Sequence, residues 1–418
     1  MASEHDRLRP GHPGRGFDPT PAFSDYQWYF FHQRSIAYLG AFSTAAYDLP
    51  ALVGIARGLI AAAPHYNNGY RNAGDVPSDA TLARICSIEA VTGFDGFPDR
   101  WLDDGAAVLD DPDLPLFRIR VAQRTEGPDA EGRRSFILVQ VAHALTEGSD
   151  SARLSRSQSA ARAGVARPQP PAPWRIALPA RLIALVFALL QLSLSRLFTP
   201  HPGTVRLASR AVPRQLLQAI ARDLGVGQRA LFMALVAHTM VNAGAPAGGG
   251  KVSCAYTTLA PGGGEHRDRF MRMRMLYTRF RNAADFRGFA RGAEETLTAD
   301  EAAGSSFVDE RSATALGFHR RLARIAPFLY APEFFAFWPH DFVFSLLTPH
   351  QLAGELSKGL LEPVYCGTTM PGVVGCIVVP GRDWVTFNFF IEEDKLAQLG
   401  RLDAMIGELS ADAALTLP

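Results

Sequence analysis

His143 is the residue whose type and position best suit chemistry in this chain. It follows an aliphatic, β-branched run at residues 135–142 and precedes Glu147, Gly148 and further turn-forming residues. This pattern predicts an imidazole held at the end of a buried strand. A histidine in such a place suits a general base that takes a proton from a hydroxyl or amine. The alternative is a hydrogen-bonded core histidine, which is the commoner outcome for a lone histidine in an apolar stretch.

The elements that would position His143 surround it in sequence. Strands are expected at residues 115–122 and 135–142, joined by a polar loop of hairpin character. A helix is expected after the histidine, at 149–161. Upstream, residues 24–38 and 50–63 carry apolar side chains at helical spacing, and a Gly-, Pro- and Asp-rich stretch separates them from the first strand.

The second half of the chain also mixes helices with strands. A helix pair is expected at 213–225 and 228–243, with Gly225 and Gly227 as the stop between them. Strands are expected at 251–259, 270–277, 341–347, 373–379 and 384–391. Helices are expected within 283–330 and at 394–410.

Composition describes a globular protein of more than one core. The chain has 418 residues, 47% hydrophobic and 20% charged, with a formal charge of +1, so nucleic acid is not an expected partner. Its four cysteines are widely spaced, which argues against a zinc site and fits a reducing compartment. The N-terminus lacks the apolar core of a signal peptide, so a cytoplasmic location is expected.

A Pro-rich connection divides the chain, and the most apolar segment follows it, at residues 182–195. This segment is too short to cross a bilayer, so we expect a packed crossover helix. The alternative is peripheral contact of residues 175–199 with the inner membrane, through their arginines. The expected organisation is a disordered tail (1–21), an N-terminal half (22–156), a linker with the apolar helix (157–203) and a C-terminal half (204–418).

Residues 115–150 resemble the catalytic-motif region of the CoA-dependent acyltransferase superfamily, which includes condensation domains and the wax ester synthase/diacylglycerol acyltransferase family. The match consists of Pro115-Leu116-Phe117 and of Ala142-His143 followed by Glu147-Gly148, against the family's His-His-x-x-x-Asp-Gly. The opening helices, the helix pair and the segment 372–396 follow the family's order more loosely.

This resemblance implies an α/β (α+β) fold of two chloramphenicol-acetyltransferase-like subdomains, each a mixed sheet flanked by helices, with a tunnel between them. It implies acyl transfer from a CoA or carrier-protein thioester to an alcohol or amine, forming an ester or amide in lipid or related metabolism. His143 would be the general base, and Glu147 and Gly148 would hold the loop. No bound cofactor or metal is implied. The co-substrate would be an acyl-CoA or an acyl-carrier phosphopantetheine, and an acyl carrier protein would be a partner beside the small-molecule acceptor.

The chain departs from the family's motif at two positions. Ala142 stands in place of the first histidine, and Glu147 in place of the aspartate. These departures support a second hypothesis, in which the protein keeps the fold but only binds a ligand or partner protein. Arg272 and Arg274, on one face of an expected strand, are candidates for contact with a CoA or phosphopantetheine phosphate, with a solvated strand face as the alternative.

Overall fold

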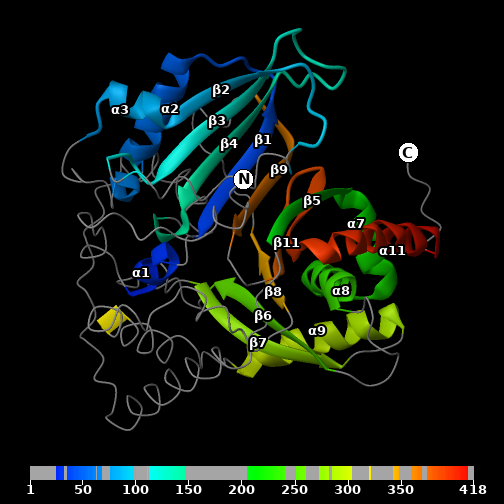
Figure 1. Cartoon of the computed structure of the whole chain (residues 1–418). Helices are drawn as coiled ribbons and strands as arrows, with labels where there is room; N and C mark the ends of the chain where they lie inside the picture. The colour runs from blue at the N-terminus through cyan, green and yellow to red at the C-terminus, as the bar shows by residue number, and fades with distance from the viewer. Residues whose placement is uncertain are drawn as a thin grey trace, which may run out of the picture.

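The computed structural model describes residues 25–32, 35–62, 64–67, 76–97, 99, 111, 113–145, 205–241, 251–259, 273–281, 285–303, 320–321, 342–347, 359–369 and 374–412. These residues form two mixed β-sheets with helices on their outer faces (Figure 1). The fold class expected from the sequence, two mixed sheets flanked by helices, is therefore confirmed. The linker and apolar segment at 157–203, the tail at 1–21 and the helix expected at 149–161 lie outside the described residues.

The first sheet carries the strands on either side of His143. Its order is β2 (Cys86–Val91), β3 (Phe117–Arg124), β4 (Ser135–Ala142), β1 (Ile36–Ser43) and β9 (Leu360–Thr369). Strands β2 and β3 are parallel and the other neighbours antiparallel. Strand β4 has the bounds expected from the sequence, and it forms the predicted hairpin with β3.

The beginning of the chain differs from the sequence prediction. The helix expected at 24–38 is wrong in its second half, because α1 (Asp25–His32) stops and residues from Ile36 onward form β1. Strand β1 lies in the sheet interior and is mostly buried, so it lacks the polar alternation that marks a half-exposed strand. The helix expected at 50–63 is confirmed as α2 (Leu49–Ala62). The stretch before β3, where no element was expected, contains α3 (Asp79–Arg84) and β2.

The second sheet is formed by the C-terminal half of the chain. Its order is β5 (Val205–Pro213), β11 (Trp384–Glu392), β10 (Gly375–Pro380), β8 (Phe342–Leu346), β6 (Lys251–Leu259) and β7 (Met273–Arg281). Strand β8 is parallel to both of its neighbours, and the remaining pairs are antiparallel. All of these strands except β5 were expected, with shifts of a few residues at their ends.

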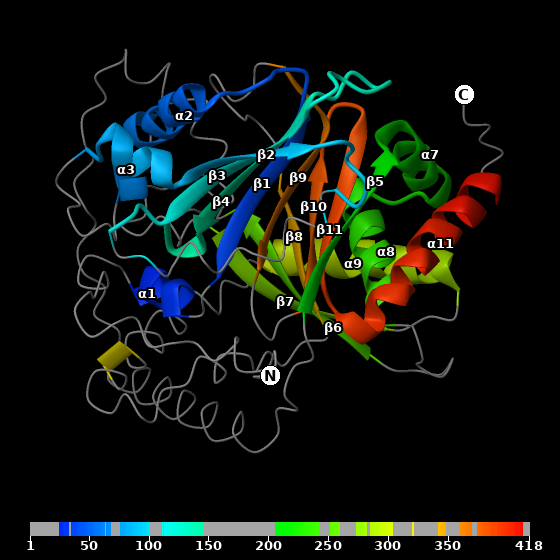
Figure 2. The ribbon, with the colours of Figure 1, turned by 45° about the horizontal axis from the view of Figure 1, so that its top comes forward.

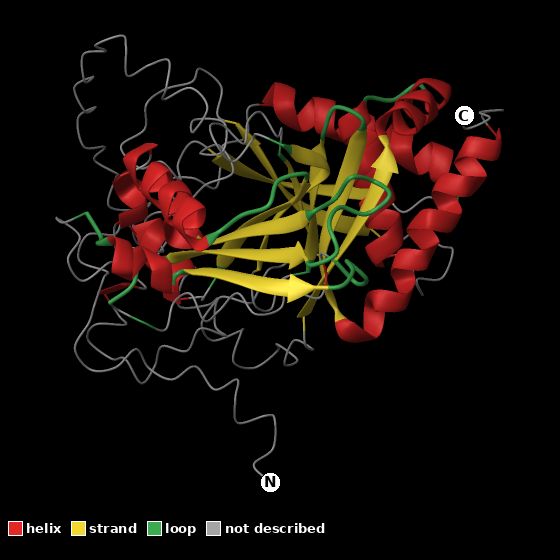
Figure 3. Ribbon diagram, turned by 90° about the horizontal axis from the view of Figure 1, so that it is seen from above, coloured by secondary structure: helices red, strands yellow, loops and turns green. Residues whose placement is uncertain are grey.

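Helices cover the outer face of the second sheet, as Figures 2 and 3 show. They are α7 (Arg214–Leu224), α8 (Gln228–Val241), α9 (Phe286–Ala303) and α11 (Leu399–Asp412), the last preceded by a 3-10 turn (Glu393–Gln398). Helix α7 ends at Gly225, which has a φ of 69°. Glycine adopts this left-handed conformation without a Cβ clash, which explains why the sequence marked the helix stop correctly.

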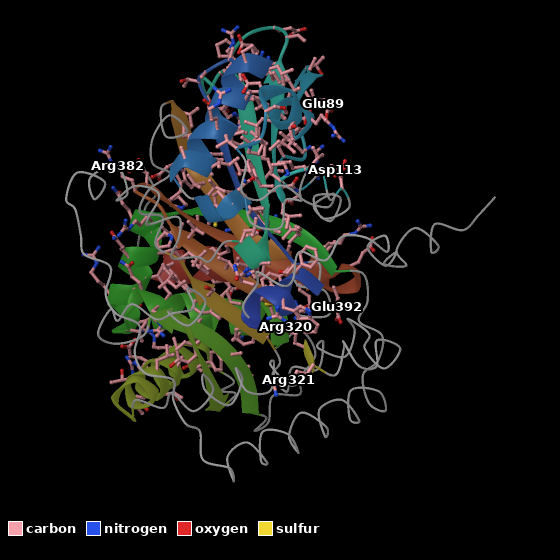
Figure 4. The ribbon with its side chains drawn as sticks, turned by 90° about the vertical axis from the view of Figure 1, so that its left-hand side faces the viewer. Glu89, Asp113, Arg320, Arg321, Arg382 and Glu392 are labelled. Carbon is pink, nitrogen blue, oxygen red and sulfur yellow. The ribbon has the colours of Figure 1, made fainter. Side chains whose placement is uncertain are left out.

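Strand β9 belongs to the C-terminal half of the chain but pairs with β1 in the first sheet, an exchange the sequence did not predict. Its residues also contact the second sheet. The Thr386 hydroxyl of β11 donates to the Val364 carbonyl of β9 at 2.6 Å. The carboxylate of Glu362 accepts backbone N–H bonds from the turn between β10 and β11, whose Arg382 lies at the edge of the molecule (Figure 4). Strand β9 therefore ties the two sheets together.

The two sheets share an apolar cluster between them. The first sheet contributes Tyr38, Phe42, Phe136, Leu138 and Tyr365, among others; the second contributes Leu207, Ala255, Val343, Ile377, Val379 and Phe390. Alternate residues of β4 point the other way, toward α2 and α3, where Ile137, Val139 and Val141 pack in a separate cluster. One face of β4 thus looks toward the second sheet, and His143 follows at the end of this strand.

Candidate functional site

Three strands of the first sheet end beside His143. Strand β4 stops at Ala142, and His143 begins a short 3-10 turn (His143–Leu145). Ile36, the first residue of β1, lies opposite Ala142 on one side and Thr369, the last residue of β9, on the other. The position of His143 at a strand end, predicted from the sequence, is confirmed.

Backbone hydrogen bonds fix this strand end. The His143 N–H donates to the Ser35 carbonyl at 2.8 Å, and the Ala142 N–H donates to the Leu116 carbonyl at 2.8 Å. The hydroxyls of Ser35 and Thr368, both buried, lie 3.1 Å apart and form a hydrogen bond between the chain just before β1 and the end of β9. Because these bonds join segments far apart in sequence, the Cα of His143 is held by the tertiary fold.

Helix α1 packs directly against the histidine turn, near the ends of β1 and β4 (Figures 1 and 2). The Gln27 side-chain amide donates to the Ala144 carbonyl at 2.9 Å, in a buried position. The ring of Phe30 stacks on the His143 imidazole, with centroids 4.1 Å apart and planes inclined by 2°. These contacts were not predicted from the sequence, because α1 and the turn are distant along the chain.

The imidazole of His143 is half-buried, and its Nδ1 atom is fully buried. With Nδ1 buried, Nε2 is the ring nitrogen left as the candidate proton acceptor. An imidazole held in this way can take a proton at Nε2 from a group that enters beside the end of β4.

Polar side chains lie next to this position on the inner face of the first sheet. Gln140, two residues before Ala142, is 1% exposed, and its Oε1 accepts a 2.6 Å hydrogen bond from Nε of Arg118 on β3. Arg120 follows two residues later on the same face, and both arginines are half-buried. Sequence reasoning did not single these residues out. The signal was present, because arginine alternates with buried Phe117 and Ile119 along β3.

Of the other candidate site residues named from the sequence, the structure describes one, Arg274. Glu147, Gly148 and Arg272 lie outside the described residues, so their roles stay predictions. Arg274 lies in β7, at the edge of the second sheet and opposite Thr258 of β6.

The cysteines do not offer an alternative nucleophile in this part of the structure. Burial raises the pKa of Cys86 to about 11 and that of Cys366 to about 12, so both stay protonated near neutral pH. Burial also raises the pKa of Cys376 well above its usual range. Among the described residues, no group of three or more His, Cys, Asp or Glu side chains is placed to hold a metal ion.

Solved structures share this architecture across nearly their whole length. Polyketide synthase associated protein 5 from Mycobacterium tuberculosis matches with a TM-score of 0.54 and 14% identity, over 91% of this chain and 96% of that one. The wax ester synthase/diacylglycerol acyltransferase from Marinobacter aquaeolei matches with a TM-score of 0.50 and 14% identity, over 93% and 98%. The condensation domain of the Monacolin K polyketide synthase matches with a TM-score of 0.50 and 13% identity, over 94% and 98%.

The chain has the fold seen in the wax ester synthase/diacylglycerol acyltransferase and in the condensation domain. The resemblance predicted from the residues around His143 is confirmed at the level of the fold. No protein-family model matches the sequence, and no curated protein matches it significantly. Within the described residues, no helix is long and apolar enough to cross a membrane.

Proposed function

We propose that this protein is an acyltransferase that moves an acyl group from a CoA or carrier-protein thioester to a hydroxyl or amine, forming an ester or amide. The observation that carries the proposal is the placement of His143: at a strand end fixed by long-range hydrogen bonds, half-buried, with Nδ1 turned into the protein. The fold supports it, since proteins of this fold include a wax ester synthase/diacylglycerol acyltransferase and condensation domains.

In the proposed reaction, Nε2 of His143 accepts the proton of the acceptor hydroxyl or amine as its oxygen or nitrogen attacks the thioester carbon. The C–S bond breaks as the new C–O or C–N bond forms, and the proton passes to the departing thiolate. Burial keeps Cys86 and Cys366 protonated, so neither would compete as a covalent acyl carrier. No covalent enzyme intermediate is required.

An acyl carrier protein is a proposed donor as well as CoA. The support is that similar solved structures include a polyketide synthase associated protein, a polyketide synthase condensation domain and a nonribosomal peptide synthetase. Glu147 and Gly148 are proposed to shape the loop after His143, and Arg272 and Arg274 to contact the phosphate of the donor.

Thiol release tests this proposal. The protein is incubated with a panel of acyl-CoAs and acyl-carrier thioesters together with alcohols and amines, and free thiol is measured. We expect His143→Ala to lower turnover by roughly 10²- to 10⁴-fold while the variant stays folded by circular dichroism. A folded His143→Ala variant with full activity would exclude the histidine base. If the protein binds a thioester but releases no thiol from it with any acceptor, the second hypothesis, a ligand-binding protein, is favoured.

A further inference from the structure

Helix α1 is anchored on both sides of the contact that it makes with His143. Trp28 and Phe31 are buried in the core beneath α2 and α3, at 3% and 8% exposure. Gln27 joins the same helix to the histidine turn, because its side-chain amide donates the buried 2.9 Å hydrogen bond to the Ala144 carbonyl. Contacts other than the Phe30–His143 stack therefore fix the helix relative to the turn.

Phe30 occupies the position where this anchored helix reaches the space between the sheets. It is half-buried and packs against both the core beneath α2 and the apolar cluster shared by the two sheets. Its ring lies parallel to the imidazole, within 2°, at a centroid distance of 4.1 Å. Aromatic rings attract each other in offset-stacked pairs, so this contact favours one orientation of the imidazole.

The strand itself supplies little to orient the imidazole. The preceding residue, Ala142, ends in a methyl group and is completely buried. The His143 N–H bond to Ser35 fixes the backbone and acts on neither side-chain torsion of the histidine. A flat ring stacked on the imidazole restricts both torsions, since rotation about either would break the parallel contact.

We infer that Phe30 is a positioning residue that orients the His143 imidazole for proton transfer. The inference rests on the proposed function for its catalytic part. Its structural part, the orientation of the ring, can be measured without any substrate.

Imidazole NMR and steady-state kinetics test the two parts separately. The ring protons of His143 are assigned by the resonance that disappears in His143→Gln. In Phe30→Leu we expect these protons to move downfield, because they leave the shielding face of the aromatic ring. We expect kcat to fall between about twofold and tenfold, with KM within about twofold. Phe30→Tyr keeps a flat ring and should restore both the chemical shifts and kcat.

Tyr66→Leu is the matched control. Tyr66 is an aromatic residue buried in the same core cluster but outside α1, so its substitution lowers the melting temperature without loosening the helix that carries Phe30. We expect its His143 resonances and kcat to match the wild type. Unmoved resonances in a folded Phe30→Leu variant would overturn the inference, and so would moved resonances with unchanged kcat. If the wild type has no acyltransferase activity, the proposed function fails, and nuclear Overhauser effects between the His143 ring protons and neighbouring backbone protons, compared in the wild type and Phe30→Leu, decide whether Phe30 orients the ring.

Discussion

Two histidines in this protein each lie against a phenylalanine, and the geometry of the two pairs differs. His143 is stacked face to face on Phe30 at 4.1 Å, where three strands end. His238 of α8 meets Phe286 of α9 edge-on, with centroids 5.7 Å apart and planes at 85°. Both imidazoles are half-buried. The two histidines are thus both half-buried but lie in different environments: His143 at the end of a sheet strand and His238 between two helices.

The two environments differ in the contacts that hold the histidine and its aromatic neighbour. The backbone of His143 is held by a hydrogen bond to Ser35, and the facing helix is bonded to the turn through Gln27. His238 sits inside a regular helix on the outer face of the second sheet, where its ring helps α8 pack against α9. Only the first arrangement combines a fixed ring with a position beside the layer between the sheets. Exposure alone does not separate the candidate base from the packing residue.

Replacing each histidine with asparagine tests this difference most directly, because asparagine keeps polarity but does not act as a base near neutral pH. We expect His143→Asn to lower acyltransferase turnover by about 10²-fold or more, because the proton acceptor is lost. We expect His238→Asn to change turnover by less than about twofold, since surface and packing substitutions away from a site act mainly on stability. Thiol release under identical conditions measures both. Equal losses in the two variants would show that the effect comes from folding.

A histidine at position 142, where the family's motif has one, tests how much room the packed core leaves beside His143. Ala142 is 0% exposed, and residues of α1 pack in the same core cluster. We expect Ala142→His to lower the free energy of unfolding by about 1–3 kcal/mol, because the larger ring overpacks a filled site. Ala61→His, at an exposed position of α2, is the control and should be near neutral. Urea unfolding measures both variants. A stable Ala142→His protein with higher turnover would mean that α1 leaves room for the family's first histidine.

The position of His143 was predicted from the sequence, whereas its contact with Phe30 was not. Strand β4 and the turn after it were predictable because a local aliphatic run ends in turn-forming residues. Phe30 was not, since its stack depends on how α1 docks and leaves no local pattern. The same reason hid β9, whose pairing with β1 joins Ile36 to Thr369 from opposite ends of the chain.

The second sheet shows the same division. Strands β6 and β11 were predicted closely because β-branched and aromatic residues are frequent in both. In the first sheet, by contrast, the start of β1 was mistaken for part of a helix, because the aromatic residues of α1 precede it and its interior position removes the period-two pattern. Local sequence therefore identifies most strands, whereas the contacts that complete the site form only in the folded chain.

The pH dependence of the free energy of unfolding tests the environment of His238 without any substrate. Burial, and to a lesser extent the charge of Arg401, lower the pKa of His238 in the folded protein. The unfolded chain therefore binds the proton more tightly, and stability is lost as pH falls below about 6.5, the usual histidine value. We expect a loss of less than about 1 kcal/mol, because a half-exposed imidazole is screened by solvent. Urea unfolding at pH 7.5 and 5.5 should show a smaller pH difference for His238→Gln than for the wild type. An identical difference in both proteins would place the acid sensitivity elsewhere and remove the desolvated environment as a distinguishing feature of His238.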